Sequence, residues 1–334
     1  MKALIAAAAA VVFLAMAGAS AGAVPGGTAA ITVVLPYFAF LTLSVGIAWR
    51  VWWWAASPVP YRIPTTCGQQ RSLPWIRTAP IDNPDNRVMA AIRVAIEALV
   101  FRSLLRNSRT HVAAGRLVLS EARLLWLASL VLHWSLLVIL LRHLRFVLLP
   151  TPFFVPPLDA LDGFLRIGAP ALLITDVLVV VALIYLLGRR LVNPLLRYMS
   201  LFTDYFALLL LLGIAVSGIA MRYVAPVNIV AVKEFALALT AFHPVVPAAP
   251  SALLLVHLLL VSTVAIYLPF SKLMHFGGVF LSPTRNLANN SRRVRHINPW
   301  NSPVPTNTYA EWEATNADKL KLAGLPLDEA DRVR

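Results

Sequence analysis

Four of the seven histidines in this 334-residue chain lie in, or at the end of, two long apolar segments. His133 and His143 are ten positions apart in LVLHWSLLVILLRHLRFVLLP (130–150), and His257 and His275 are eighteen positions apart further along the chain. Ionisable side chains are rare at membrane depth, and those that occur there are usually functional. A single histidine would more often bond a neighbouring carbonyl, but two pairs indicate a binding site.

Haem ligation is the chemistry that two pairs of apolar-flanked imidazoles suit best. A zinc ion would need four ligands, and no carboxylate or thiolate stands beside these positions. Haem needs only two axial ligands from the protein, and its porphyrin edge fits apolar surroundings. Two b haems with both axial positions filled have no open site for a substrate, so their expected task is electron transfer. Six aromatic residues could line the pockets: Trp126, Trp134, Phe146, Tyr267, Phe270 and Phe276.

The elements that must position these histidines are apolar runs near or above the ~20 residues that cross a bilayer as a helix. Hydrophobic residues make up 59% of the chain and charged residues 13%, about half the charged share of soluble domains. Continuous runs also argue against barrel strands, which alternate. We therefore expect an all-α integral membrane protein with a four- or five-helix bundle that holds two b haems. The six expected transmembrane helices are 3–24, 31–54, 124–149, 165–187, 202–222 and 251–274.

Basic residues are unevenly divided between the loops, and this division predicts the orientation. Ten arginines and four acids lie in 55–123, and 188–200 holds three arginines and no acid. The segment 150–164 has no Lys or Arg, and 223–250 has only Lys233. We therefore expect a multi-pass protein of the bacterial inner membrane whose basic loops and tail face the cytoplasm. The net charge of +14 is explained by this division of basic residues between the two sides of the membrane. We therefore expect membrane lipid as a partner and do not expect nucleic acid.

The first apolar segment has two interpretations. Lys2, the apolar run and AGASAGA resemble a signal peptide, but we expect the segment to be retained, with both termini in the cytoplasm. Apolar residues at helical spacing in 86–107 predict an amphipathic helix on the membrane surface or on a partner. The expected parts are a signal-like or extra helix (1–24), a transmembrane helix (31–54), a cytoplasmic loop (55–123), a haem-binding bundle (124–275) and a cytoplasmic tail (276–334).

The third and sixth spans run antiparallel, and this determines how the histidines pair. His133 and His275 would lie near the cytoplasm, and His143 and His257 near the outer face. At the rise of an α-helix the two separations are about 15 Å and about 27 Å, so sites on the order of 20 Å apart follow if the helices tilt. Eighteen residues are five full turns, which puts His257 and His275 on one face, whereas His133 and His143 are offset by about a quarter turn.

This spacing resembles the dihaem cytochrome b (gamma) subunit of membrane-bound nitrate reductase, over roughly 31–54 and 118–275. In that family such histidines bind a cytoplasm-side and an outer-side haem in the nested pairing described above. The resemblance would make 1–24 an addition.

Longer stretches resemble the M subunits of the Dsr complex associated with dissimilatory sulfite reductase, from about Leu35 to Trp300. They are SPVPYRIPTTCGQQRSLPWI (57–76), LVLHWSLLVILLRHLRF, IYLPFSKLMHFGGVFLSPTRNL (266–287) and RRVRHINPW (292–300). This resemblance implies a cytochrome b of sulfur metabolism that uses quinone and serves a cytoplasmic iron–sulfur subunit related to heterodisulfide reductase. Periplasmic cytochrome c and iron–sulfur proteins would be further partners.

Other polar residues have competing interpretations. Arg142 and Arg145, which flank the second histidine of the third span, would pair with haem propionates or extend to the outer headgroups. Lys233, Glu234 and His243 are candidates for a quinol site, because quinone chemistry needs hydrogen-bonding groups that exchange protons. A solvated outer loop is the alternative for these three.

The remaining residues suggest structural roles. Asp176 and Asp204 have apolar neighbours, and a structural hydrogen bond is favoured over proton transfer for both. His111 and His296 are expected at the surface. Cys67 is the only cysteine, which excludes intrachain disulfides, thiolate-held iron–sulfur clusters and covalent haem attachment, and a subunit contact is expected there.

Three alternatives stay open. The first is a cytochrome b subunit of another membrane oxidoreductase, such as respiratory nitrate reductase. The second is a proton- or metal-coupled transporter, although the symmetric pairs of broken helices typical of transporters are not evident. The third is a cofactor-free anchor, which leaves the histidines unexplained. As an electron-transfer subunit, the chain would take part in quinol oxidation or quinone reduction.

Overall fold

The computed structural model of the chain describes residues 1–57, 71, 73, 75–106, 108–113, 115–163, 171–282, 286–290 and 305–328. Cys67 and His296 lie outside these residues, together with all of 292–300 and most of 57–76. The beginning of the fourth expected span, 165–170, also lies outside them.

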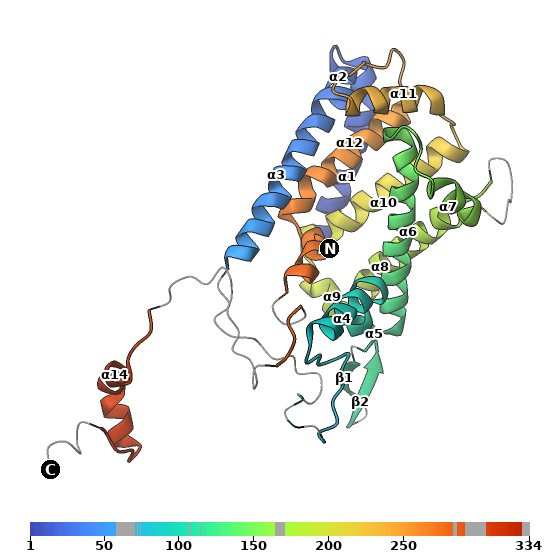
Figure 1. Cartoon of the computed structure of the whole chain (residues 1–334). Coiled ribbons are helices and arrows are strands. Elements are labelled where there is room, and N and C mark those ends of the chain that lie inside the picture. The colour runs from blue at the N-terminus through green and yellow to red at the C-terminus, as the bar shows by residue number, and fades with distance from the viewer. Residues whose placement is uncertain are drawn as a thin grey trace.

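Six long helices form a bundle (Figure 1). They are α1 (Lys2–Ser20), α3 (Leu35–Ala56), α6 (Arg123–Val147), α8 (Ile174–Val192), α10 (Phe202–Tyr223) and α12 (Ala252–Tyr267). Within the described residues, five stretches are long and apolar enough to cross a membrane: Lys2–Ala23, Gly27–Ala56, Arg123–Val147, Phe202–Tyr223 and Ala252–Phe270. The remaining helix, α8, has only 19 residues, and its charged residues Asp176, Arg189 and Arg190 leave a shorter uncharged stretch between them. The expected all-α membrane fold is confirmed, whereas the count of six spans stays a prediction.

The first helix packs into the core of the bundle. Ala7 is fully buried and packs with Tyr205 of α10 and Leu260 of α12. A Cβ on Gly18 would lie 2.8 Å from the Cα of Val256, so the absence of a side chain lets α1 and α12 approach this closely. Residues of α1 therefore contribute to the same apolar cluster as those of α10 and α12.

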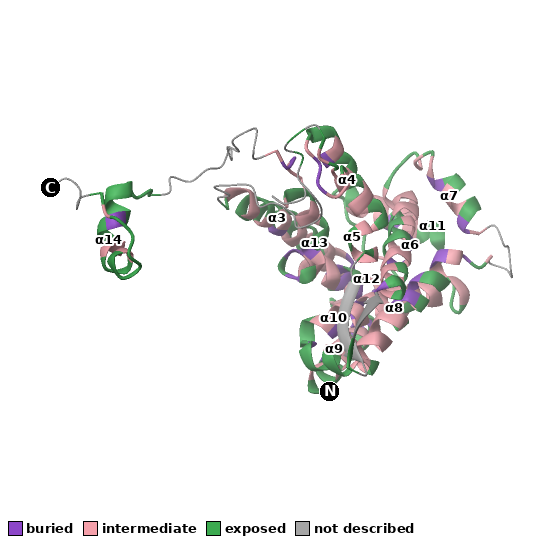
Figure 2. Ribbon diagram, turned by 90° about the horizontal axis from the view of Figure 1, so that it is seen from below, coloured by how far each residue is buried: buried purple, intermediate pink, exposed green. Residues whose placement is uncertain are grey.

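The outward faces of the bundle are apolar. Phe13 is 70% exposed, and Phe40 and Trp52 are each 62% exposed. Figure 2 shows few fully buried residues and many exposed ones along the bundle helices. Exposed apolar surface of this extent on a helical bundle is typical of a face that lipid covers.

The two ends of the bundle carry different elements (Figure 1). One end, here called the inner end, carries α4 (Arg87–Val100), α5 (Arg102–Leu105), α9 (Pro194–Met199) and an antiparallel hairpin of β1 (Ser108–Ala113) and β2 (Arg116–Glu121). The outer end carries α2 (Gly27–Ala29), α7 (Val155–Asp162) and α11 (Ile229–Thr240). The remaining elements are η1 (Ala21–Ala23), the π-helix η2 (Ala30–Val34), η3 (Leu268–Phe270), η4 (Lys272–Met274), α13 (His275–Gly278), η5 (Val279–Leu281) and α14 (Tyr309–Leu322).

Two expected elements were wrong in detail. The 86–107 helix breaks at Phe101, whose φ is 54°, and an unexpected β-hairpin follows it. The sixth helix ends at Tyr267, because Pro269 has no N–H to continue the ladder, and His275 begins the separate helix α13. The expected continuous five turns between the last two membrane histidines, with one shared face, are therefore absent.

Candidate functional site

The two histidines of α6 are held in the same way. Nδ1 of His133 lies 2.7 Å from the backbone oxygen of Ser129, and Nδ1 of His143 lies 2.7 Å from that of Ile139. A carbonyl oxygen can only accept, so Nδ1 carries the proton in both rings. The other ring nitrogen, Nε2, is then the atom that could bind a metal.

His257 is held from a neighbouring helix. Its Nδ1 lies 2.9 Å from the Oγ of Ser217, a residue of α10 that is 5% exposed. The Ser217 hydroxyl donates to the backbone oxygen of Ile214 at 3.0 Å, so its oxygen accepts from Nδ1. Gly218 gives the ring room, because a Cβ there would lie 3.3 Å from Cε1 of His257. Two adjacent small residues of α10 thus set the orientation of this imidazole.

The structure brings the four histidines together in two pairs. At the inner end, the rings of His133 and His275 have centroids 5.7 Å apart and planes at 82°. The Nδ1 of His275 lies 2.9 Å from the backbone oxygen of Lys272. In the second pair, His143 and His257 lie close enough for an electrostatic interaction between the two rings. In all four rings Nδ1 is within hydrogen-bond distance of an oxygen, which leaves Nε2 as the atom that could bind a metal.

This donor set fits haem better than a bare metal ion. Metal–imidazole bonds are about 2 Å long, which places two axial imidazoles of one iron with centroids about 6 Å apart. The 5.7 Å between His133 and His275 is close to that spacing. In the part of the chain that the structure describes, no group of three or more His, Cys, Asp or Glu side chains could hold a metal ion. Two imidazoles alone require a cofactor that brings the other ligands itself.

The arginines that flank His143 are paired with protein carboxylates. Arg142 donates from Nε to Asp159 at 2.7 Å and from Nη1 to Asp162 at 2.6 Å. Arg145 also pairs with Asp159. Arg142 is nearly buried, which disfavours the alternative that its side chain extends to the headgroups. Its pairing with a propionate stays a prediction, and such a group would share Arg142 with these carboxylates.

Both aspartates in apolar surroundings have hydrogen-bond partners. Asp176 accepts from the hydroxyl of Tyr223 at 2.8 Å. Asp204 accepts from the N–H of Leu201 at 3.0 Å and pairs with Lys272 at 2.9 Å. These contacts agree with the structural role that the sequence favoured.

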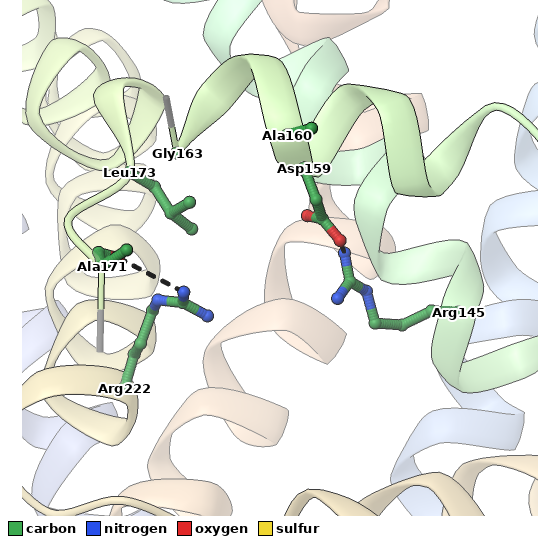
Figure 3. Close-up of a pocket in the computed structure, with 7 residues that line it drawn as sticks. All are labelled: Arg145, Asp159, Ala160, Gly163, Ala171, Leu173 and Arg222. Carbon is green, nitrogen blue, oxygen red and sulfur yellow. Dashed lines mark hydrogen bonds and ion pairs between the residues drawn. The ribbon is translucent and has the colours of Figure 1, made fainter. Parts of the chain in front are cut away.

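A cavity of about 440 Å³ lies beside the arginines at the outer end (Figure 3). Arg145 from α6 and Arg222 from α10 lie on facing sides of it, and Asp159 of α7 points toward Arg145. The full lining is Arg145, Asp159, Ala160, Gly163, Ala171, Leu173 and Arg222. The three residues expected at a quinol site, Lys233, Glu234 and His243, are not part of this lining. The structure places the first two on α11 and the third just after it.

Several residues of the site carry no signal in the sequence. Ser217 is 40 positions from His257, and nothing in the local pattern of either marks them as partners. Asp159 and Asp162 stood out only as acids in a loop without basic residues, and their ion pairs with α6 were not expected. The PPLDALD motif that contains them would have suggested a helix N-terminus, but no partner.

Comparison with known proteins adds independent findings. Residues 88–296, which include all four membrane histidines, match the model of the nitrate reductase gamma subunit family. The chain is 42% identical over 273 residues to an Hdr-like menaquinol oxidoreductase cytochrome b-like subunit from Archaeoglobus profundus, covering 80% of this chain and 81% of that protein. It is likewise 42% identical over 275 residues to the subunit of the same description from Archaeoglobus fulgidus, covering 80% and 82%.

Proposed function

The chain belongs to the nitrate reductase gamma subunit family, and we propose that it is a membrane cytochrome b linking the quinone pool to a cytoplasmic iron–sulfur subunit. The observation that carries the proposal is the set of four histidines, each engaged through Nδ1 and gathered in two pairs. The names of the two Archaeoglobus relatives support quinol chemistry, since both are described as menaquinol oxidoreductase subunits.

Two b haems are the proposed cofactors. His133 and His275 would hold the inner iron, and His143 and His257 the outer iron. When bound, haem would supply a one-electron redox centre. The acceptors at Nδ1 orient each ring and make Nε2 a stronger donor, as such partners do at metal sites generally. Ser217 does this for the outer pair from a separate helix.

The outer cavity is the proposed place for the polar head of the quinol. Arg145 and Arg222 can donate to a quinol oxygen, and Asp159 can accept from a quinol hydroxyl. Lys233, Glu234 and His243 remain the alternative set. The cavity is preferred because it has room for a ligand and is lined by both donors and an acceptor, whereas none of the three alternative residues lines it. A propionate role of Arg142 and Arg145 would place the outer haem edge next to this cavity.

The inner end is the proposed docking side for a heterodisulfide-reductase-like iron–sulfur subunit. It carries the arginine-rich loop and α9, and the tail joins them, since Asn289 donates to Asn83 at 2.6 Å. With these basic segments in the cytoplasm, the protein would be a six-span protein of the inner membrane. The resemblance in sequence to Dsr complexes further suggests sulfur metabolism, with periplasmic cytochrome c and iron–sulfur proteins as partners. Co-purification distinguishes that complex from a nitrate reductase.

Haem content and reduced-minus-oxidised spectra of the purified full chain test the proposal. We expect about two b haems per chain in the wild type and one in His143→Ala, because the outer iron would lose an axial ligand. His243→Ala is the matched control, since this histidine belongs to neither pair, and it should keep both haems. A colourless wild-type protein from haem-replete cells would refute the proposal.

A further inference from the structure

Phe101, at the inner end, has a left-handed backbone conformation. Phe101 joins α4 to α5 with φ 54° and ψ 45°. This region is unfavourable for bulky residues, because Cβ crowds the backbone, and helices that end there usually use glycine. Among the residues that the structure describes, Phe101 and Phe242 are the non-glycine residues with positive φ. A strained conformation at a large side chain suggests that the side chain is needed in that direction.

Two tryptophans of α6 hold the corner that precedes Phe101. Trp126 donates from Nε1 to the backbone oxygen of Val100 at 2.7 Å, and Trp134 donates to that of Leu99 at 3.0 Å. The two indoles are eight residues apart, two helical turns plus about 80°, and both reach the same corner from α6. The corner is therefore tied to the helix that presents the inner histidine.

The ring of Phe101 reaches that histidine. Its centroid lies 5.0 Å from that of His133, with the planes at 80°. On the far side of the corner, Arg102 and Arg106 both pair with Asp82. The backbone is thus anchored before and after Phe101, and its side chain points at an imidazole of the inner pair.

We infer that Phe101 is a positioning residue, whose ring fixes the orientation of His133 and covers one side of its imidazole. The inference rests on the proposed function, in which His133 and His275 are axial ligands. An apolar ring beside the ligand lowers the local polarity, and this disfavours the oxidised iron with its additional positive charge. Phe101 therefore raises the reduction potential of the inner haem relative to a solvated site.

Replacing the ring while keeping the backbone tests this role. Phe101→Gly accepts the left-handed conformation without strain, so the corner can persist while the ring is lost. Phe242→Gly is the matched control, because Phe242 has φ 59° and its ring stacks on Tyr37. The readouts are the midpoint potentials of both haems by redox titration, and the low-spin EPR signal of the inner haem, which depends on the angle between its imidazole planes.

We expect Phe101→Gly to lower the potential of the inner haem and change its EPR signal, with the outer haem unchanged. Phe101→Tyr should resemble the wild type, and Phe242→Gly should change neither haem. If Phe101→Gly does not accumulate, Trp134→Phe loosens the corner by one hydrogen bond and should shift the same haem in the same direction.

Two results would overturn the inference. In the first, the wild type holds two haems, and the inner haem of Phe101→Gly titrates as in the wild type. In the second, both haems shift equally, which would indicate a general loosening of the bundle. Either result leaves the proposed function intact, whereas a wild type without haem would remove both.

Discussion

The hydrogen bond between Ser217 and His257 gives the sharpest test of the outer site. Ser217→Ala removes the only hydroxyl that the structure places at Nδ1 of His257, at a position that is 5% exposed. In the haem-bound state the iron would fix the ring, and Nδ1–H would keep only the backbone oxygen of Ile214, which also interacts with this imidazole. A buried donor without any partner costs about 1–3 kcal/mol, roughly 5- to 150-fold in an equilibrium constant, and the remaining contact keeps the cost at or below that range. Loss of such partners at metal sites typically weakens binding roughly 10- to 100-fold.

We therefore expect Ser217→Ala to weaken binding of the outer haem by about one to two orders of magnitude and to leave the inner haem unchanged. The assay is transfer of haem from the detergent-solubilised chain to apomyoglobin, with the spectrum of His143→Ala identifying the outer haem. Ser262→Ala is the matched control, because Ser262 is equally buried and lies on α12 five residues after His257. Ser217→Thr keeps the hydroxyl and should retain most of the affinity.

Two outcomes would refute this reasoning. If the outer haem of Ser217→Ala leaves within twofold of the wild-type rate, the hydroxyl does not support the ligand. If both haems leave faster to the same extent, the substitution acts on the packing of the bundle.

Two further predictions concern Gly218 beside the outer pair and Asp82 at the inner end. Gly218→Ala should weaken the outer haem without lowering the melting temperature of the bundle, because alanine favours the helix by roughly 0.5–1 kcal/mol while its Cβ, 3.3 Å from Cε1, displaces the His257 ring. Haem retention and circular dichroism melts separate the two effects, and unchanged haem retention would contradict the prediction. Burial raises the pKa of Asp82, but hydrogen bonds and charges of Arg102 and Arg106 outweigh this and hold the pKa below its usual value. The folded pKa is depressed, so the anchoring of α5 is complete above the unfolded pKa of about 4 and is lost as the pH falls through the folded value. Limited proteolysis of this loop against pH should show the transition in the wild type, and Asp82→Asn should be cleaved readily at every pH.

Some features of the fold could be predicted because they depend on local sequence. The apolar runs that became α1, α3, α6, α10 and α12 were evident, since the cost of inserting a segment into a membrane is nearly a sum over its own residues. The break at Pro269 could also be predicted, because proline lacks the N–H that a helix needs, although the eighteen-residue spacing of the histidines suggests a continuous helix. The hairpin lies in a polar loop with little periodicity, and Gly115 was its clearest signal.

The four histidines could be proposed as ligands from the sequence alone, because histidines in apolar runs are rare and their spacing is countable. Their partners were decided by tertiary structure. Successive residues of an α-helix point in directions about 100° apart, so a small rotation of one helix changes which side chains face its neighbour. No local sequence pattern determines how α10 is rotated toward α12 or where α4 ends on α6. For this reason Ser217 beside His257, Phe101 beside His133 and Asp162 beside Arg142 emerge only when the helices are packed together.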